Sequence, residues 1–179
     1  MPKTTRTVRV ENYLLEMLKV QARKAGVSEN ALVGSVLESY LKVGAWTETM
    51  PVIMLRKEHL VSFLKHLPDA EIAAIGREMG REVTQESVRF MYPDFTPQTF
   101  LDILEAQSKY MRWGAYTTSW KGSVLDLYVR HDFGRKWSVF LEAYVGQEGA
   151  NLLDSDVEGH VAEGMISLKF TQKKTVRIP

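Results

Sequence analysis

The sequence predicts an α+β protein of two modules. A strand and two helices fill the first 45 residues, and a larger domain of helices packed on a small antiparallel sheet follows. Residues 5–10 alternate between polar and apolar side chains, which is the period of a strand. Apolar residues then recur at helical spacing as far as Met111, and after Trp113 the period returns to two. These changes of period define the expected architecture.

The first element is a short strand over residues 5–10 with two different faces. Val8 and Val10 lie on one face, and the opposite face carries Thr5, Thr7 and Arg9. A lone strand leaves its backbone N–H and C=O groups without partners, and no second strand follows it closely in the sequence. The nearest candidate partner is therefore the same strand of a second copy.

Two helices follow the strand and are separated by a glycine. Leu14, Leu15, Leu18 and Ala22 recur at helical spacing, and Gly26 suits a left-handed residue that ends a helix after about residue 25. Ser28 offers a side-chain oxygen to the start of the next helix, which we expect to run to about Val43. The apolar side of this second helix is formed by Ala31, Leu32, Val36 and Tyr40.

This order of elements resembles the ribbon-helix-helix family of DNA-binding proteins, to which MetJ and Arc belong. The resemblance rests on the alternating strand, on ARKAGVSENALV across the turn and on LESYL near the end of the second helix. It implies that two chains pair their strands into an antiparallel ribbon that enters the major groove of double-stranded DNA. It also implies a homodimer whose four helices share one core.

The resemblance further implies which residues contact DNA. Thr5, Thr7 and Arg9 would face the bases, and Arg and Thr both have side chains that bond to base edges. The start of the second helix would hold a phosphate through the backbone, and its residues are Ser28, Glu29 and Asn30. Glu29 departs from what a phosphate site prefers. Arg6 also departs from the pattern, because it falls on the face that is usually apolar. A dimerisation module without DNA binding is the alternative.

Composition indicates an ordinary globular protein that remains in the cytoplasm. The 179 residues include 45% hydrophobic and 25% charged side chains, with no apolar run long enough to span a membrane and no leader. The absence of cysteine excludes disulfides and thiolate metal sites. The first 45 residues hold seven Lys and Arg against four Asp and Glu, whereas the remainder has an acidic excess of two. This asymmetry favours an N-terminal contact with DNA.

The rest of the chain reads as a linker at residues 46–55 and an α+β domain at residues 56–179. We expect one helix from about Lys57 and one from Thr96-Pro97. Between them, a helix from Pro68 should carry an apolar face formed by Ile72, Ile75, Met79, Val83 and Phe90. Gly76 and Gly80 would permit another helix to approach closely or would simply be tolerated on the helix surface. A hairpin at about 113–130 and a strand at about 164–170 belong to the domain. Between them, an amphipathic helix is expected after Asp132 or Gly134, with Trp137, Phe140, Leu141 and Tyr144 on its apolar stripe.

Residues that carry chemistry are few. His59 and His66 lie about 10 Å apart along a helix, too far to share one metal ion alone. His131 and Asp132 lie where a strand meets a helix, and the favoured reading is that Asp132 caps that helix while His131 packs beneath it. We expect no catalytic residues, no metal, no cofactor and no enzymatic activity, because no nucleophile elbow or phosphate loop is present.

Three roles remain open for the larger domain. Its order of elements is similar to that of vinyl-reductase-type small-molecule-binding domains and haem-NO-binding sensor domains, which implies sensing of a small-molecule effector. The aromatic residues of the hairpin and the last helix would then line a pocket; they are Trp113, Tyr116, Trp120, Tyr128, Trp137 and Tyr144. Assembly of dimers into higher oligomers is the second role. An antitoxin whose larger domain binds a protein partner is the third.

Overall fold

The chain divides into two compact units. The structure, a computed structural model, describes residues 4–44, 48, 54–91 and 96–173, and for residues 83–91 it describes the backbone alone. The first unit comprises residues 1–51 and the second comprises residues 52–179. This boundary falls inside the predicted linker at residues 46–55, most of which lies outside the described residues.

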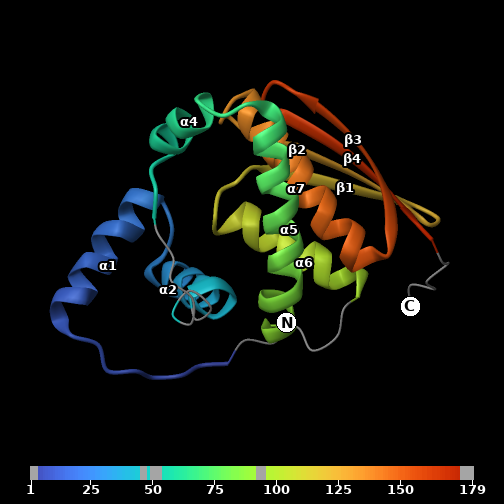
Figure 1. Cartoon of the computed structure of the whole chain (residues 1–179). Coiled ribbons are helices and arrows are strands. Elements are labelled where there is room, and N and C mark those ends of the chain that lie inside the picture. The colour runs from blue at the N-terminus through green and yellow to red at the C-terminus, as the bar shows by residue number, and fades with distance from the viewer. Residues whose placement is uncertain (1–3, 45–47, 49–53, 92–95, 174–179) are drawn as a thin grey trace. The chain divides into compact units, whose positions relative to one another are not determined.

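The first unit is helical, as Figure 1 shows in blue. It contains α1 (Asn12–Ala25), α2 (Glu29–Ser39) and the short π-helix η1 (Tyr40–Gly44). The predicted turn is confirmed, because Gly26 ends α1 in the left-handed conformation at φ 68° and Ser28 caps α2. The second helix was predicted to be regular to about Val43, but its last turn widens into η1. The Tyr40 hydroxyl donates a hydrogen bond to Glu48 at 2.9 Å from this wider turn.

The predicted strand at residues 5–10 is not formed in the single chain. Residues 4–10 run as a continuous non-helical segment into α1 and have no regular secondary structure (Figure 1). A strand is defined by the partner whose backbone it bonds, and no segment in the described part of the chain pairs with these residues. The N-terminal ribbon is therefore not a property of one chain.

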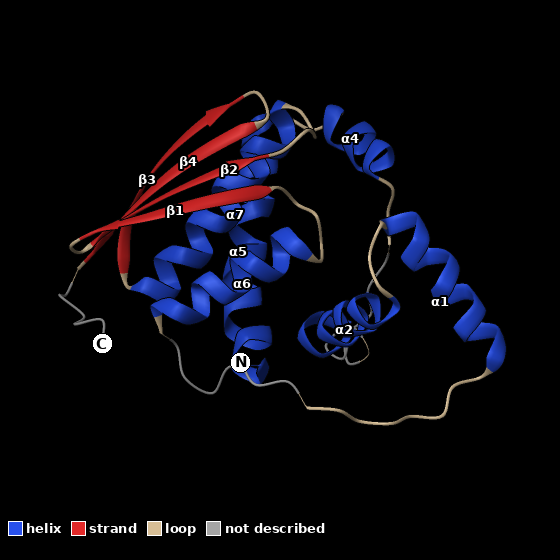
Figure 2. Ribbon diagram, turned by 180° about the vertical axis from the view of Figure 1, so that it is seen from behind, coloured by secondary structure: helices blue, strands red, loops and turns tan. Residues whose placement is uncertain are grey.

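The second unit combines helices with one antiparallel sheet. Its helices are α4 (Lys57–Lys65), α5 (Asp69–Met91), α6 (Pro97–Lys109) and α7 (Arg135–Leu153). Its strands are β1 (Ala115–Lys121), β2 (Val124–Arg130), β3 (Ser155–Ala162) and β4 (Met165–Gln172), in the spatial order β1-β2-β4-β3. The predicted α+β class is confirmed for this unit, and Figure 2 shows the helices gathered on one face of the sheet.

Helix α7 lies at the centre of the unit, between the sheet and α5. Toward the sheet, the absence of a side chain at Gly149 makes room for the ring of Phe170 on β4, and Phe100 of α6 packs edge-on against that ring at 5.4 Å. Toward α5, the α7 backbone meets glycines rather than side chains. A helix enclosed on both sides must be apolar nearly all round, and α7 was instead predicted to be amphipathic.

The close approach of α5 and α7 depends on Gly76 and Gly80. A Cβ atom on Gly76 would lie 2.7 Å from the carbonyl oxygen of Phe140, and one on Gly80 would meet the carbonyl oxygen of Tyr144. Both contacts are with backbone atoms, which cannot move aside as a flexible side chain would. Of the two readings of this glycine pair, close helix packing is therefore the correct one.

The apolar face predicted for α5 needs a correction. Ile72 is buried, but Ile75 and Met79 are 41% and 40% exposed. The glycine face of α5 turns toward α7, so these two side chains lie at the margin of the interface. Large apolar side chains therefore did not identify the face of α5 that packs against α7, because the closest contact between the two helices is made at glycines.

The start of α6 and the hairpin are confirmed. Thr96 accepts a hydrogen bond from the Thr99 N–H at 3.2 Å, and the Thr99 hydroxyl accepts one from the Thr96 N–H, which makes a reciprocal cap. Strands β1 and β2 pair from Ala115 with Arg130 to Lys121 with Val124, and Gly122 turns the chain with φ 61°. The predicted last strand is also present as β4, whereas β3, its partner at the sheet edge, was not predicted.

Candidate functional site

The N-terminal segment is exposed along its whole described length. Thr5, Thr7 and Arg9 are exposed, and Val8 is 74% and Val10 42% exposed. The polar residues proposed to contact bases are thus accessible, and so are the two valines on the predicted apolar face. Nothing within the described chain covers either side of this segment.

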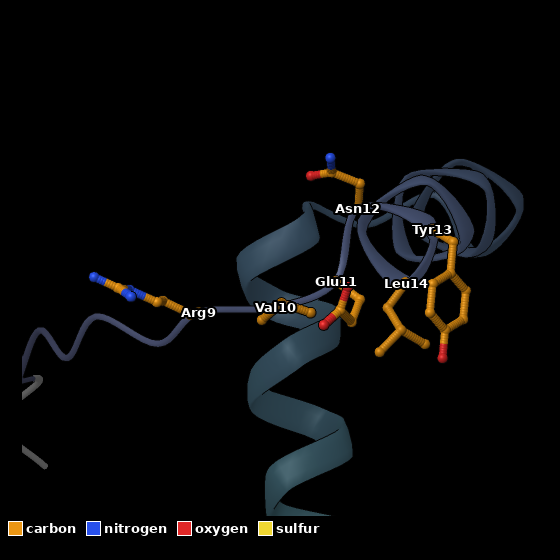
Figure 3. Close-up of a pocket in the computed structure, with 6 residues that line it drawn as sticks. All are labelled: Arg9, Val10, Glu11, Asn12, Tyr13 and Leu14. Atoms are coloured by element: carbon orange, nitrogen blue, oxygen red, sulfur yellow. The ribbon is translucent and has the colours of Figure 1, made fainter.

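A hollow of about 540 Å³ lies where the segment joins α1 (Figure 3). Its lining residues are consecutive: Arg9, Val10, Glu11, Asn12, Tyr13 and Leu14. In Figure 3 the Arg9 side chain extends away from the first turn of α1, whereas Tyr13 and Leu14 project from that turn on one side. The hollow therefore combines an apolar wall with a charged outer end.

The start of α2 has the geometry of a helix N-terminus with one side-chain cap. The Ser28 hydroxyl oxygen accepts a hydrogen bond from the Ala31 N–H at 3.1 Å. The first backbone N–H groups of a helix have no acceptor within the helix, so those of Glu29 and Asn30 point outward from the positive end of its dipole. Glu16, which is hydrogen-bonded to Lys19, is the main cause that raises the pKa of the Lys19 amine, and the Glu29 carboxylate makes a smaller electrostatic contribution in the same direction.

The two predicted groups of DNA contacts are not joined directly. Within the described residues, no hydrogen bond or ion pair links Thr5, Thr7 or Arg9 to the start of α2. Helix α1 lies between them in sequence, and the turn at Gly26 and Ser28 connects the two helices. Each group is thus placed by its own local structure.

The first unit has almost no core of its own. Ala22, at 2% exposure, is its only buried side chain among residues 4–44 and 48. Most of its large apolar side chains are instead exposed by 36% to 74%: Val8, Val10, Tyr13, Leu14, Leu15, Met17, Val20, Val27, Val33, Val36, Leu37, Tyr40 and Leu41. Such a density of exposed apolar surface marks an interface.

In the second unit, His131 is positioned by two hydrogen bonds. The Phe133 N–H donates to His131 Nδ1 at 3.2 Å, so a neutral ring carries its proton on Nε2 and donates to the Ser138 hydroxyl at 2.9 Å. In this tautomer His131 cannot accept the Ser138 proton, and the pair is not an activated nucleophile. Burial lowers the pKa of His131, against the opposing charges of Asp132 and Glu163, which favours the neutral ring.

The predicted role of Asp132 as a helix cap is wrong. Gly134, at φ 80°, occupies the capping position of α7, and no side chain caps that helix. Asp132 instead pairs with Lys57 of α4 at 2.5 Å, which lowers the pKa of its carboxyl group. Asp132, two residues after the end of β2, therefore forms an ion pair with α4.

A row of stacked aromatic rings runs along α7. Phe133, Trp137, Phe140 and Tyr144 are stacked in succession with ring centroids 5.2, 4.7 and 5.6 Å apart. Trp113 packs edge-on against this row and lies 5.3 Å from Tyr144. Of the aromatics predicted to line a pocket, Trp137 and Tyr144 are thus core residues, and Trp113 is half-buried against them. Tyr128 does not join them, because it is 48% exposed on the outer face of the sheet.

The row ends at a buried polar cluster of Gln107, Tyr144 and Glu148. The Gln107 Nε2 atom lies 3.3 Å from the Tyr144 hydroxyl oxygen and 3.4 Å from Glu148 Oε2. Glu148 is fully buried, and its Oε1 atom has no hydrogen-bond partner in the described structure. Burial raises the pKa of Glu148 to about 8, against a lowering by the Gln107 hydrogen bond, so this carboxyl is mostly protonated at pH 7.

The sequence reasoning missed Glu148, although a signal for it exists. The predicted apolar stripe of the helix passes through Trp137, Phe140, Leu141 and Tyr144, and its next position at helical spacing is Glu148. An acidic residue on the buried stripe of a helix is uncommon unless it is paired. The position therefore indicated a buried carboxyl.

Two further searches concern the described residues. No group of three or more acidic or histidine side chains among them is arranged to hold a metal ion. None of the described helices combines the length and the apolar character needed to cross a membrane.

Neither a protein-family model nor a curated protein matches this chain.

Proposed function

We propose that the protein is a sequence-specific DNA-binding transcriptional regulator that acts in the cytoplasm as a homodimer. Residues 5–10 of two copies pair into an antiparallel ribbon that enters the major groove of double-stranded DNA. Thr5, Thr7 and Arg9 contact base edges, and the start of α2 at Ser28, Glu29 and Asn30 holds the phosphate backbone. The protein has no catalytic role in this proposal.

One observation carries the proposal: among its described residues unit 1 buries a single side chain, while most of its large apolar side chains remain exposed. Burying a Leu or Val side chain fully contributes about 1.5–3 kcal/mol, so covering this surface would favour association with a partner strongly. A second copy offers the same apolar stripes and the same unpaired segment. Both are self-complementary under the two-fold symmetry that is commonest among homo-oligomers.

The polar side of the segment supports DNA as the ligand. Pairing through residues 5–10 would bury Val8 and Val10 and leave Thr5, Thr7 and Arg9 on the opposite face. The excess of three positive charges in residues 1–45 would double in a dimer. A basic two-stranded ribbon of this kind has the width and charge of a major-groove reader.

The second unit is proposed to sense a small-molecule effector, with assembly of dimers into higher oligomers as the alternative. The buried polar cluster around Glu148 favours sensing, because assembly alone gives no reason to place a poorly bonded carboxyl in the core. Light scattering of the intact protein separates these roles. A dimer that remains a dimer at high concentration removes the assembly role.

An electrophoretic mobility shift with the DNA upstream of the protein's own gene tests the ribbon. We expect Arg9→Ala to weaken binding to the specific site by about 1–3 kcal/mol per half-site, because a bidentate contact with guanine is lost. Arg23→Ala is the matched control, since Arg23 is exposed in the last turn of α1. Undiminished sequence preference in Arg9→Ala would contradict the assignment.

Dimer formation has a separate test in Val8→Asp. Because Val8 is 74% exposed in the single chain, this substitution costs little in a monomer. In a paired ribbon it places a charge in the shared core, and we expect light scattering to show dissociation. Thr7→Asp adds the same charge on the opposite, polar face and should leave the oligomeric state unchanged. An unaltered dimer in Val8→Asp would remove the ribbon as the pairing element.

A further inference from the structure

The hydrogen bonds of the buried polar cluster are incomplete. A single amide group, Nε2 of Gln107, serves both Tyr144 and Glu148 at 3.3 and 3.4 Å, which is the long end of the range for hydrogen bonds. Glu148 Oε1 has no partner, and neither does the buried hydroxyl of Tyr110, one helical turn beyond Gln107 on α6. Buried polar atoms without partners are rare and require an explanation.

Gln107 also lines a small cavity. Its volume is about 20 Å³, enough for roughly one water molecule. Gln107, Trp113 and Tyr116 belong to its lining, and the remaining lining residues are mostly aliphatic: Leu104, Val129, Leu141 and Val145, with Ser108 and Gly114. One side chain, Gln107, thus borders the cavity and contacts the buried carboxyl.

The segment that contributes Trp113 and Gly114 to the cavity lining also holds a strained residue. Arg112, between α6 and β1, has φ 57°, a left-handed conformation that is uncommon for a residue with a side chain. The next residue, Trp113, is only half-buried, and its carbonyl oxygen accepts a hydrogen bond from the Trp137 indole N–H at 3.3 Å. Strained backbone persists where the surrounding structure requires it, and it is concentrated at binding sites and switches.

We propose that the cavity, Gln107 and Glu148 together form the closed state of a binding site for a small organic ammonium ion. The ligand's hydrocarbon part occupies the cavity as Trp113 moves outward, and its N–H groups donate to Glu148 and to the Tyr144 hydroxyl oxygen. This inference rests on the effector-sensing part of the proposed function and names the chemical class of the effector.

The chemistry of the lining selects a cation. A buried carboxylate is costly without an opposite charge, and an ammonium group supplies both the charge and the missing donors. The aromatic rings of Trp113 and Tyr144 add favourable cation–π contacts. On binding, the Glu148 O–H bond breaks and its proton passes to solvent, or to the ligand nitrogen when the amine arrives neutral. No other covalent change occurs.

Thermal unfolding of the full-length protein at pH 7 tests the proposal with named probes. The probes are methylamine and benzylamine hydrochlorides, and benzyl alcohol is the neutral analogue of benzylamine. We expect at least one of the amines to raise the melting temperature by a few degrees at concentrations well above its dissociation constant. We also expect that amine to change the tryptophan fluorescence, whereas benzyl alcohol should do neither.

Two substitutions on α7 separate the site from general effects. Glu148→Gln keeps the shape of the side chain and removes its charge, so we expect the response to amine to disappear. Glu142→Gln is the matched control, because Glu142 is a half-buried carboxyl of the same helix that lies against β3. We expect it to retain the response.

A measurement on the unaltered protein keeps the test independent of variant folding. Calorimetric titration in buffers of different ionisation enthalpy should show release of close to one proton per ammonium ion bound at pH 7. The proposal is overturned if neither amine stabilises the protein, if benzyl alcohol acts equally well, if Glu148→Gln still responds or if no proton is released. The amine-binding experiments contain no DNA. Their failure is therefore distinguishable from a failure of the Arg9-dependent mobility shift.

Discussion

Glu148→Gln is expected to change how the stability of the second unit depends on pH. The side chain is fully buried, and its pKa is raised to about 8 from an ordinary 4.5. Between these values the folded protein holds a proton that the unfolded chain releases. The contribution of Glu148 to the free energy of unfolding is therefore fully present below pH 4.5 and is lost as the pH rises through about 8.

The size of the effect follows from the same two pKa values. Each unit of pKa difference is worth about 1.4 kcal/mol, so the buried carboxyl costs roughly 5 kcal/mol in total once the pH exceeds 8. This is an upper figure, because any relaxation that hydrates Glu148 reduces it. Glutamine in its place binds no proton and should abolish this part of the pH dependence.

Urea unfolding followed by tryptophan fluorescence at fixed protein concentration provides the assay. Between pH 5 and pH 8 the wild-type free energy of unfolding should fall relative to Glu148→Gln by about 1.4 kcal/mol per pH unit. Glu78→Gln removes an exposed carboxyl of α5 and should follow the wild type. If wild type and Glu148→Gln gave parallel curves over this range, the reasoning from burial would be refuted.

Two other substitutions test how the fold is held together. Gly76→Ala places a Cβ 2.7 Å from the Phe140 carbonyl oxygen, and we expect a loss of about 1–3 kcal/mol in urea unfolding, whereas Glu78→Ala on the exposed side of α5 should be nearly neutral. Equal stability of the two variants would exclude tight packing of α5 on α7. Thr96→Ala removes the α6 cap and should lower the free energy of unfolding by about 1 kcal/mol. Gln98→Ala, on the exposed side of the same first turn, is its control, and a similar loss in both variants would contradict the capping role.

Features that depend on neighbouring residues were predictable from the sequence. The left-handed Gly26, the Ser28 cap and the Thr96-Pro97 helix start each follow from local backbone chemistry, and each is present in the structure. The β1-β2 hairpin was also predictable, because its strands alternate cleanly and are joined by a glycine turn.

Features that depend on distant parts of the chain were not predictable. Strand β3 contains Gly159 and His160 where an alternating apolar pattern would be expected, and its position is fixed by pairing with β4. Residues 5–10 show the opposite case. Their side chains alternate clearly between polar and apolar, but they form no strand because the described chain offers no partner strand. Pairing thus outweighs pattern at both sites.

The candidate site divides in the same way. Thr5, Thr7 and Arg9 were identified by their alternation, and the structure shows them exposed without testing what they bind. The Gln107–Glu148 contact joins α6 to α7 across 41 positions of sequence, and no local pattern specifies such a distance. Only the position of Glu148 on an apolar stripe could have indicated that its carboxyl would be buried.

The enclosure of α7 constrains how the second unit is made during translation. The residues of α5 leave the ribosome before α7, but β3 and β4 follow it, and they cover the side of α7 that faces the sheet. A nascent chain that stops within β3 therefore exposes the sheet-facing side of a helix that is buried in the finished fold. The rings of Phe100 and Phe170 can meet beside Gly149 only after β4 has emerged. Until then this side of α7 has no sheet to pack against.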